Sequence, residues 1–432
     1  MDCVELRANI DELEREFRTL KEKVKVIRES EESSKELRDA LELINSSSSD
    51  QLLKKYYLDF REQNPEIPSA VTLGERIDIM NAYGYPMSVE AIAAANDGRV
   101  LIGAASTGDL YTGFLSNRGK LMLGERIDIK NADGESAYIR SIATTKDGRR
   151  VLIGGDNGVF YEGSYDDQGK LELGERIDIT DTNGNPASIG SIATTEDGHV
   201  LIGGSSGVLR EGLCDDRDGL VLGERIDIRD TSGELAWVFS IVATKDGHVL
   251  IGGDGMLWLG SYNDQGELTL GERIGGIKDA DGNLAGISSI AVAKDGRMLI
   301  GGENGTLYAG SYGDHDELVL GERIDIRDAS GVPISAYSIV ITEDDHVLIG
   351  GGDGVYVGSY DDRGGLIMRE RVDIKNAEES SASISSIVVT KDGRMLVGGA
   401  WGALYVGTYN VSSETLKRYL PGIIKKGESG EQ

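Results

Sequence analysis

The 432-residue sequence predicts an all-β protein, a seven-bladed β-propeller, preceded by an α-helical coiled-coil segment. Three observations support this prediction. The first 66 or so residues carry a helical heptad pattern. From residue 71 a unit of about 49 residues recurs, and each copy contains four short β-type segments. Four-stranded units at this interval are typical of propeller blades, whereas solenoid repeats are shorter and helical repeats lack a period of two.

The composition narrows the range of functions. Glycine is abundant, with 60 residues against 6 prolines, which predicts many tight turns between short strands. Acidic residues outnumber basic ones by 74 to 45, so the net charge is −29. Because such a chain repels phosphate backbones and anionic lipids, we expect no nucleic-acid or membrane partner. The acidity favours solubility or a basic partner.

The two cysteines, Cys3 and Cys214, lack metal-ligand spacing and do not indicate a disulfide framework. We expect neither a metal nor a cofactor. The N-terminus has no apolar signal-peptide region, and no apolar run approaches the ~18 residues that a membrane span needs. The sequence therefore predicts a soluble, cytoplasmic protein.

Residues 1–45 show apolar side chains at alternating intervals of three and four, which predicts an amphipathic coiled coil. The candidate oligomerisation residues are Leu6, Ile10, Leu13, Phe17, Leu20 and Val24. In a parallel dimer Glu16 would face Lys21 favourably, but Lys23 would face Arg28. Two interpretations stay open: a homo-oligomer or partner-helix contact, and a helix packed on its own neighbours. Residues 46–70 are predicted to be a linker and a short helix.

The repeat is marked by the heptapeptide LGERIDI, whose arginine recurs at intervals of 50, 50, 49, 48, 50 and 48 residues. The second copy shows the four segments most clearly, as YIRSIATT, RVLIGG, VFYEGSY and KLELGERIDI. The Asp147-Gly148 turn joins the first two as a hairpin, and the glycine-rich residues 154–158 join the next two. In the heptapeptide, Arg76 and Asp78 share one strand face. We interpret the heptapeptide as part of the structural frame of each blade and not as a functional site.

The number of blades follows from the strand count. The sequence holds seven first strands and seven fourth strands, but the first copy of the fourth strand, residues 71–79, precedes every blade. The last blade ends at its third strand, ALYVGTY. The N-terminal copy is therefore predicted to complete the last blade and close the ring within residues 71–410. Residues 411–432 are predicted to be a short helix and a polar tail.

The pattern in residues 139–161, with Ser-Ile, Lys-Asp-Gly-Arg and Leu-Ile-Gly-Gly in order, resembles the two-component-regulator-propeller and WD-repeat superfamily. The resemblance extends over residues 71–409, although the Trp-Asp and Gly-His signatures of WD repeats are absent. What it implies is a propeller fold and a binding scaffold.

No set of residues indicates catalysis, so we expect a non-enzyme. Three of the four histidines, His199, His248 and His346, occupy the turn position that holds Arg in other blades and are predicted to be solvent-facing substitutes. The fourth is His315. Acidic loops such as Asp279 to Asn283 resemble fragments of calcium loops but are too short, and turn geometry accounts for them.

The copies differ mainly where the chain enters the first strand. The residues there that differ from the other copies are Glu90, Tyr138, Arg140, Trp237, Phe239 and Tyr337. The turn between the second and third strands also varies, and it adds Trp401. Because Trp, Tyr and Arg are common anchors of binding surfaces, these seven residues are the predicted partner-binding site. Trp258 aligns with tyrosines of the third strand and is assigned to the frame.

The functional hypothesis is a non-catalytic protein- or peptide-binding scaffold or adaptor, with a regulatory role, whose N-terminal helices oligomerise it or dock it into a larger complex. The alternative is a lectin-like or small-ligand sensor. A broad aromatic patch would favour the first, and a pocket with converging polar groups would favour the second.

Overall fold

The computed structural model describes residues 71–409 except 106, 117, 216–218, 264–265, 314–316, 329, 343–344 and 361–364. The predicted helical segments at 1–45, 46–70 and 411–432, the oligomerisation residues from Leu6 to Val24, and His315 lie outside the described residues. Residues Val71–Asn410 form one compact unit.

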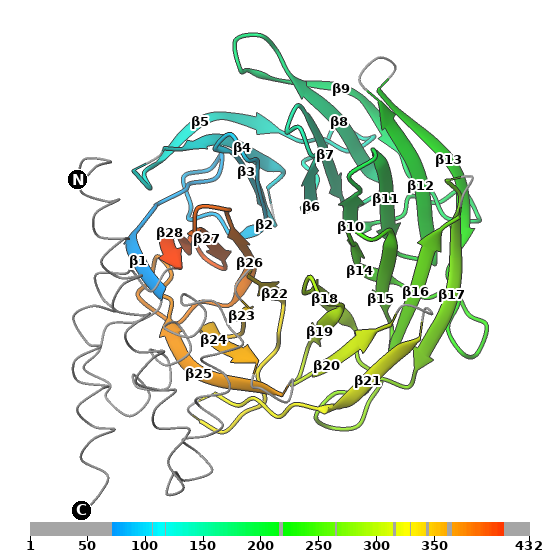
Figure 1. Cartoon of the computed structure of the whole chain (residues 1–432). Helices are drawn as coiled ribbons and strands as arrows, with labels where there is room; N and C mark the ends of the chain where they lie inside the picture. The colour runs from blue at the N-terminus through cyan, green and yellow to red at the C-terminus, as the bar shows by residue number, and fades with distance from the viewer. Residues whose placement is uncertain are drawn as a thin grey trace, which may run out of the picture. The chain divides into compact units, whose positions relative to one another are not determined.

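The described residues form 28 strands in seven four-stranded antiparallel sheets that surround a central axis (Figure 1). The inner strands are β2 (Val89–Ala94), β6 (Ile139–Thr144), β10 (Ile189–Thr194), β14 (Val238–Ala243), β18 (Ile287–Val292), β22 (Ser338–Ile341) and β26 (Ile384–Val389). The second strands are β3 (Arg99–Ala104), β7 (Arg150–Gly155), β11 (His199–Gly204), β15 (His248–Gly253), β19 (Arg297–Gly302), β23 (His346–Gly350) and β27 (Arg394–Gly399).

The third strands are β4 (Asp109–Leu115), β8 (Val159–Tyr165), β12 (Val208–Asp215), β16 (Met256–Tyr262), β20 (Leu307–Tyr312), β24 (Gly354–Tyr360) and β28 (Leu404–Tyr409). The outer strands are β1 (Val71–Arg76), β5 (Leu121–Asp128), β9 (Leu171–Asp178), β13 (Gly219–Asp227), β17 (Leu268–Gly275), β21 (Leu318–Arg323) and β25 (Leu366–Asp373). Blades 1 to 6 run from β2 to β25 in order, and blade 7 consists of β26, β27, β28 and β1.

The predicted ring closure is confirmed. The first strand, β1, pairs antiparallel with the last, β28, and Val71 lies opposite Tyr409. The inner strand of each blade contacts that of the next all the way round, including β2 with β26. An outer strand from one end of the domain thus completes a sheet made at the other end, which removes the open edge that an unclosed ring would expose.

The hydrophobic core lies in the spaces between blades. The second strands are its most buried part, because their side chains are covered on both faces, as in β7 (Arg150–Gly155). One cluster joins Leu201 and Leu209 of blade 3 to Val249 and Ile251 of blade 4, and the other clusters likewise span blade pairs. A single blade cannot bury these faces alone, so the stability of each blade depends on its neighbours.

Glycines set the distance between blades. A Cβ on Gly103 would lie 2.6 Å from Cγ2 of Ile139 in blade 2, and one on Gly154 would lie 2.5 Å from Cγ2 of Ile189 in blade 3. The corresponding glycine of every other blade faces the next inner strand in the same way. The repeated Leu-Ile-Gly-Gly segment therefore allows a β-branched side chain to pack directly on a neighbouring backbone.

A serine hydroxyl ties neighbouring inner strands together. The Ile192 N–H donates to Ser141 Oγ at 2.9 Å, and the Ile339 N–H donates to Ser289 Oγ at the same distance. The same bond joins Ile241 to Ser191, Ile387 to Ser338 and Ile92 to Ser386. Each bond gives a partner to an inner-strand N–H that would otherwise be orphaned at the seam.

The basic residue after each Asp-Gly turn belongs to a second seam. The Arg99 guanidinium lies 3.9 Å from the ring centre of Tyr165 in the next blade, and Arg297 lies 4.3 Å from that of Tyr360. The three histidines occupy the same place, and His199 lies 4.3 Å from Tyr262 between ring centres. The equivalent pairs are His248 with Tyr312 and His346 with Tyr409.

The prediction that these histidines face solvent was therefore wrong. His346 is 4% exposed, and the side chains of His199 and His248 are each 15% exposed. Their flat rings replace the guanidinium against the tyrosine of the next blade. In blades 1 and 3 the tyrosine position holds Leu115 and Cys214, and there Arg394 donates to the Leu115 carbonyl while Arg150 pairs with Glu162.

The heptapeptide is confirmed as the outer strand of each blade. Its Arg and Asp, two residues apart, form exposed ion pairs in most blades, such as Arg176–Asp178 at 2.7 Å and Arg76–Asp78 at 2.9 Å. Exposed pairs of this kind stabilise little. The last isoleucine of the motif, for example Ile79 or Ile129, is buried and anchors this part of the chain to the core. Trp258, 4% exposed, lies in the frame as predicted.

Candidate functional site

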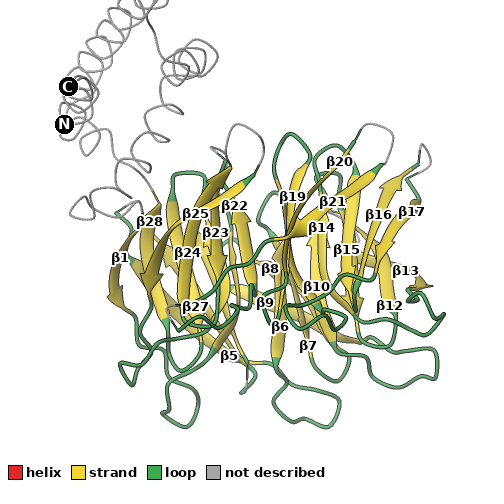
Figure 2. Cartoon of the chain, turned by 90° about the horizontal axis from the view of Figure 1, so that it is seen from below, coloured by secondary structure: helices red, strands yellow, loops and turns green. Residues whose placement is uncertain are grey.

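The blades present two faces, which differ in their connections (Figure 2). We call the face where the inner strands begin the entry face. It holds the long connections from each outer strand to the next inner strand and the turns between second and third strands. The exit face holds the Asp-Gly turns and the turns between third and outer strands. All seven predicted partner-binding residues lie on the entry face or at its axial rim.

Every long connection on the entry face folds around one Asn or Asp. In blade 2, Asn131 Oδ1 accepts the N–H groups of Asp133 and Glu135 at 2.9 and 3.0 Å. The same pair of hydrogen bonds forms at Asn81, Asp181, Asp230, Asp279, Asp328 and Asn376. These oxygens fix the turn, and the residues at its tip are free to vary.

This geometry also explains the acidic loops that resembled calcium sites. Asp279 Oδ1 accepts two backbone N–H groups, and its Oδ2 accepts a hydrogen bond from Asn304 Nδ2 at 3.0 Å. Within the described residues, no three His, Cys, Asp or Glu side chains are grouped to hold a metal ion.

Charged side chains meet at the axial rim of blades 1 and 2. Arg140 forms an ion pair with Asp156 of its own blade, and Glu90 lies close enough to Arg140 to interact electrostatically with it. Burial raises the pKa of Glu90, and the charge of Arg140 and a hydrogen bond from Ser385 only partly oppose that rise. Tyr138, 44% exposed, also interacts electrostatically with Arg140. The structure therefore brings three of the predicted residues together here.

A second group lies on blade 4. The Trp237 and Phe239 rings are 5.4 Å apart between centres and tilted by 31°. Phe239 is flanked by two glycines, since a Cβ on Gly190 would lie 3.4 Å from its Cα and one on Gly286 would lie 3.4 Å from its ring. The backbone N–H of Trp237 donates to the Asp254 carboxylate at 3.2 Å. Because these two glycines have no side chains, there is room for the two aromatic rings. Trp237 keeps 39% of its surface exposed.

Trp401 and Tyr337 stand apart from these two groups. Trp401 is 59% exposed at the tip of a turn, with a φ of 53°. Its backbone N–H donates to Ser88 Oγ, next to β2 of blade 1, at 3.0 Å, so this hydrogen bond links blade 7 to blade 1 at the closure seam. Tyr337 is half-buried at the rim of blade 6. The predicted site is thus a set of separate anchors around one face, and not one pocket.

The entry face also exposes apolar residues that sequence reasoning missed. Among the described residues 14 large hydrophobic side chains are exposed, and eight of them lie on this face. Tyr138, Trp237 and Trp401 were predicted. The five that were missed are Met80, Tyr83, Tyr85, Leu284 and Val332. Tyr83 and Tyr85 are 78% and 68% exposed, and most other copies have polar residues at these two positions of the repeated turn. Comparing the turn tips between copies could have found them.

No protein-family model and no curated protein matches this chain. What is shown is the architecture, a propeller of seven four-stranded blades in the described residues. The described part of the chain also contains no helix that is both long and apolar enough to cross a membrane.

Proposed function

We propose that the protein is a non-catalytic scaffold or adaptor that binds a protein or peptide partner through its entry face. The observation that supports this most is the concentration of exposed apolar side chains there, eight of 14 among the described residues. Exposed aromatic residues on a rigid frame are typical of binding surfaces, because they bury much area with little loss of side-chain entropy.

The partner expected for this face carries apolar side chains and basic groups. Apolar residues would cover Tyr83 in the connection from β1 to β2, Trp401 in blade 7, and Trp237, which directly precedes β14 of blade 4. Basic groups would meet the acidic connections and a chain whose net charge is −29. Opposite charge would raise the association rate more than the final affinity, so binding should weaken at high salt mainly through slower association.

The test replaces two anchors together, Trp237→Ala with Trp401→Ala, in a pull-down from native lysate followed by mass spectrometry. Each tryptophan is expected to contribute about 2 kcal/mol or more, so the double variant should lose the partner while its thermal unfolding is unchanged. The matched control is Met122→Ala with Ile367→Ala, which removes exposed side chains from the outer strands. Equal recovery of the partner by the tryptophan variant would refute the site.

The N-terminal segment is proposed to oligomerise the chain or to dock it on a partner helix. Several copies of one face in an assembly would raise avidity without a stronger single site. Deletion of residues 1–45 should convert an oligomer to a monomer in light scattering. An unchanged mass would contradict self-association through Leu6, Leu13 and Leu20.

Kinship with the two-component-regulator and WD-repeat propellers, a regulatory role and a cytoplasmic location also stay proposals. They rest on the repeat pattern and on the sequence features of the N-terminus.

A further inference from the structure

Blade 4 keeps an aspartate that blade 2 pairs with an arginine. In both blades the turn between the second and third strands carries an aspartate directly after Gly-Gly, Asp156 in blade 2 and Asp254 in blade 4. Arg140, the second residue of β6, binds Asp156 through two nitrogens, and its Nη2 lies 3.2 Å from Oδ2. The equivalent residue of β14 in blade 4 is Phe239. Blade 4 therefore has the acid without the guanidinium that its counterpart holds.

Three contacts place Asp254 beside the aromatic pair of blade 4. Its Oδ2 accepts the backbone N–H of Trp237 at 3.2 Å. Its backbone pairs in an antiparallel bridge with Gly286, next to β18 of blade 5. The Phe239 ring lies against the same Gly286, where a Cβ would be 3.4 Å from it. Two aromatic rings and one carboxylate thus share one place on the entry face, and both Trp237 and Asp254 are exposed to solvent there.

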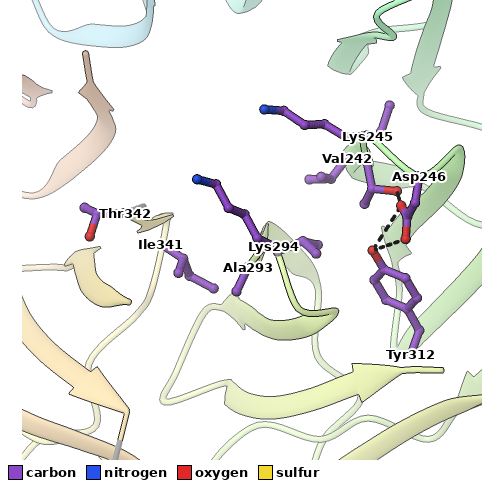
Figure 3. Close-up of a pocket in the computed structure, with 11 residues that line it drawn as sticks. Val242, Lys245, Asp246, Ala293, Lys294, Tyr312, Ile341 and Thr342 are labelled. Carbon is purple, nitrogen blue, oxygen red and sulfur yellow. Dashed lines mark hydrogen bonds between the residues drawn. The ribbon is translucent and has the colours of Figure 1, made fainter. Parts of the chain in front are cut away.

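Other turn aspartates of the ring are held by side chains of the chain itself. Asp353, in the corresponding turn of blade 6, lies 2.7 Å from Nη1 of Arg371. On the exit face Asp246 accepts a hydrogen bond from Tyr312 Oη at 3.2 Å, at the edge of a cavity lined by three blades (Figure 3). Within the described residues Asp254 forms no ion pair, and its carboxylate bonds only a backbone N–H. Its charge is therefore available to a cation from solvent.

The frame of the same chain shows how one carboxylate and one aromatic ring hold a guanidinium. At the seam between blades 1 and 2, Arg99 Nε donates to Asp97 Oδ2 at 2.7 Å. The same guanidinium lies 3.9 Å from the ring centre of Tyr165. Arg297 makes the two corresponding contacts at the seam between blades 5 and 6. Blade 4 presents these two kinds of group on the entry face, with no arginine of its own between them.

We propose that Trp237, Phe239 and Asp254 form a subsite that binds an arginine side chain of the partner. The Asp254 carboxylate would accept hydrogen bonds from the guanidinium, and the exposed indole of Trp237 would stack on its flat face. Arginine is favoured over lysine, because a guanidinium is planar and more weakly hydrated than an ammonium group. The inference rests on the function proposed for the entry face and names the side chain that its blade 4 anchor recognises.

The test titrates the full-length protein with the capped peptide acetyl-Gly-Arg-Gly-amide by ligand-observed NMR. Matched peptides carry lysine, or citrulline, which keeps the shape of arginine without its charge. Asp254→Asn removes the charge and keeps an oxygen for the Trp237 N–H. Phe239→Arg rebuilds the arrangement of blade 2, so that the chain's own guanidinium fills the subsite. The matched control is Asp133→Asn, which removes one exposed carboxylate from another entry-face connection, and every variant is checked for an unchanged thermal midpoint.

The arginine peptide should bind saturably, with a Kd on the order of millimolar for a single side chain. Asp254→Asn and the citrulline peptide should each weaken binding by about tenfold, since a charge-assisted contact is lost. The lysine peptide should bind more weakly than the arginine peptide, Phe239→Arg should block binding, and Asp133→Asn should bind as the wild type does.

Three results would each overturn the subsite: no saturable binding of the arginine peptide, equal affinity for the lysine or citrulline peptide, or equal affinity in Asp254→Asn. The pull-down with Trp237→Ala and Trp401→Ala tests the proposed function separately. If the peptides fail while that double variant still loses the partner, the function of the entry face stands and only the arginine subsite falls.

Discussion

The seams between blades and the entry face are built from the same repeat but use it in opposite ways. At the seams three kinds of contact recur: a glycine under a β-branched side chain, a serine hydroxyl that accepts an isoleucine N–H, and a basic residue packed on a tyrosine. On the entry face the turn geometry recurs while its exposed side chains differ from blade to blade. Repetition marks the frame, and variation on a constant frame marks the surface available for recognition.

The largest expected effect is the loss of ring closure. A chain beginning at residue 80 lacks β1 and the buried side chains of Val71 and Ile79, each 2% exposed. Their burial is worth roughly 3–6 kcal/mol, and β28 would become an open edge. Urea unfolding should show this loss relative to a chain beginning at residue 71. Equal midpoints for the two chains would contradict closure by β1.

The next effect tests the packing of the seam. Gly154→Ala places a methyl group 2.5 Å from Ile189 Cγ2, so the two blades must move apart. We expect a loss of about 2 kcal/mol in the free energy of unfolding. The matched control is Gly313→Ala, where a Cβ would meet no atom within 4 Å and the φ is not positive. If both variants unfold at the same urea concentration, the seam glycines are not packing residues.

A smaller effect is expected at the serine seam. Ser289→Ala leaves the N–H of Ile339 without its acceptor in a buried position, which costs about 1–2 kcal/mol. The neighbouring Ser288→Ala is the control, because Ser288 lies at the axial rim and makes only long hydrogen bonds of 3.4 and 3.5 Å. Chemical denaturation should separate the two variants. A larger loss for Ser288 would contradict the assignment of frame and rim.

The smallest effect has the opposite sign and concerns the rim. Burial raises the pKa of Glu90, so the folded state binds a proton more tightly than the unfolded chain does. Ionised Glu90 therefore lowers stability above its folded pKa, and this loss vanishes below the ordinary value of 4.5. Glu90→Gln should stabilise slightly at pH 7 and not at lower pH in thermal unfolding. A loss of stability at pH 7 would make Glu90 part of the frame.

The fold could be predicted because the information for each blade is local. Alternating strands, Asp-Gly turns and the regular interval all lie within one repeat unit, and counting strands was enough to predict closure by residues 71–79. The positions of the histidines could not be predicted in this way, because they depend on contacts between blades. His199 packs on Tyr262 of the next blade, and only the assembled seam shows that an imidazole at this position is covered.

The candidate site was predicted only in part for a similar reason. Trp237 and Trp401 are visible as large residues among small ones in the aligned copies, and both are exposed on the entry face. The pairing of Trp237 with Phe239 depends on the neighbouring glycines, Gly190 and Gly286, which belong to two other blades.

The measurement that tests the central claim most directly is photocrosslinking with p-benzoylphenylalanine at single sites on different surfaces. Tyr83 and Trp401 probe the entry face, and Met122 and Ile367 probe the outer strands. The account predicts that the captured partner crosslinks from the two entry-face positions and not from the outer-strand positions. Crosslinks from Met122 or Ile367, with none from Tyr83 or Trp401, would contradict the assignment of the entry face as the recognition surface.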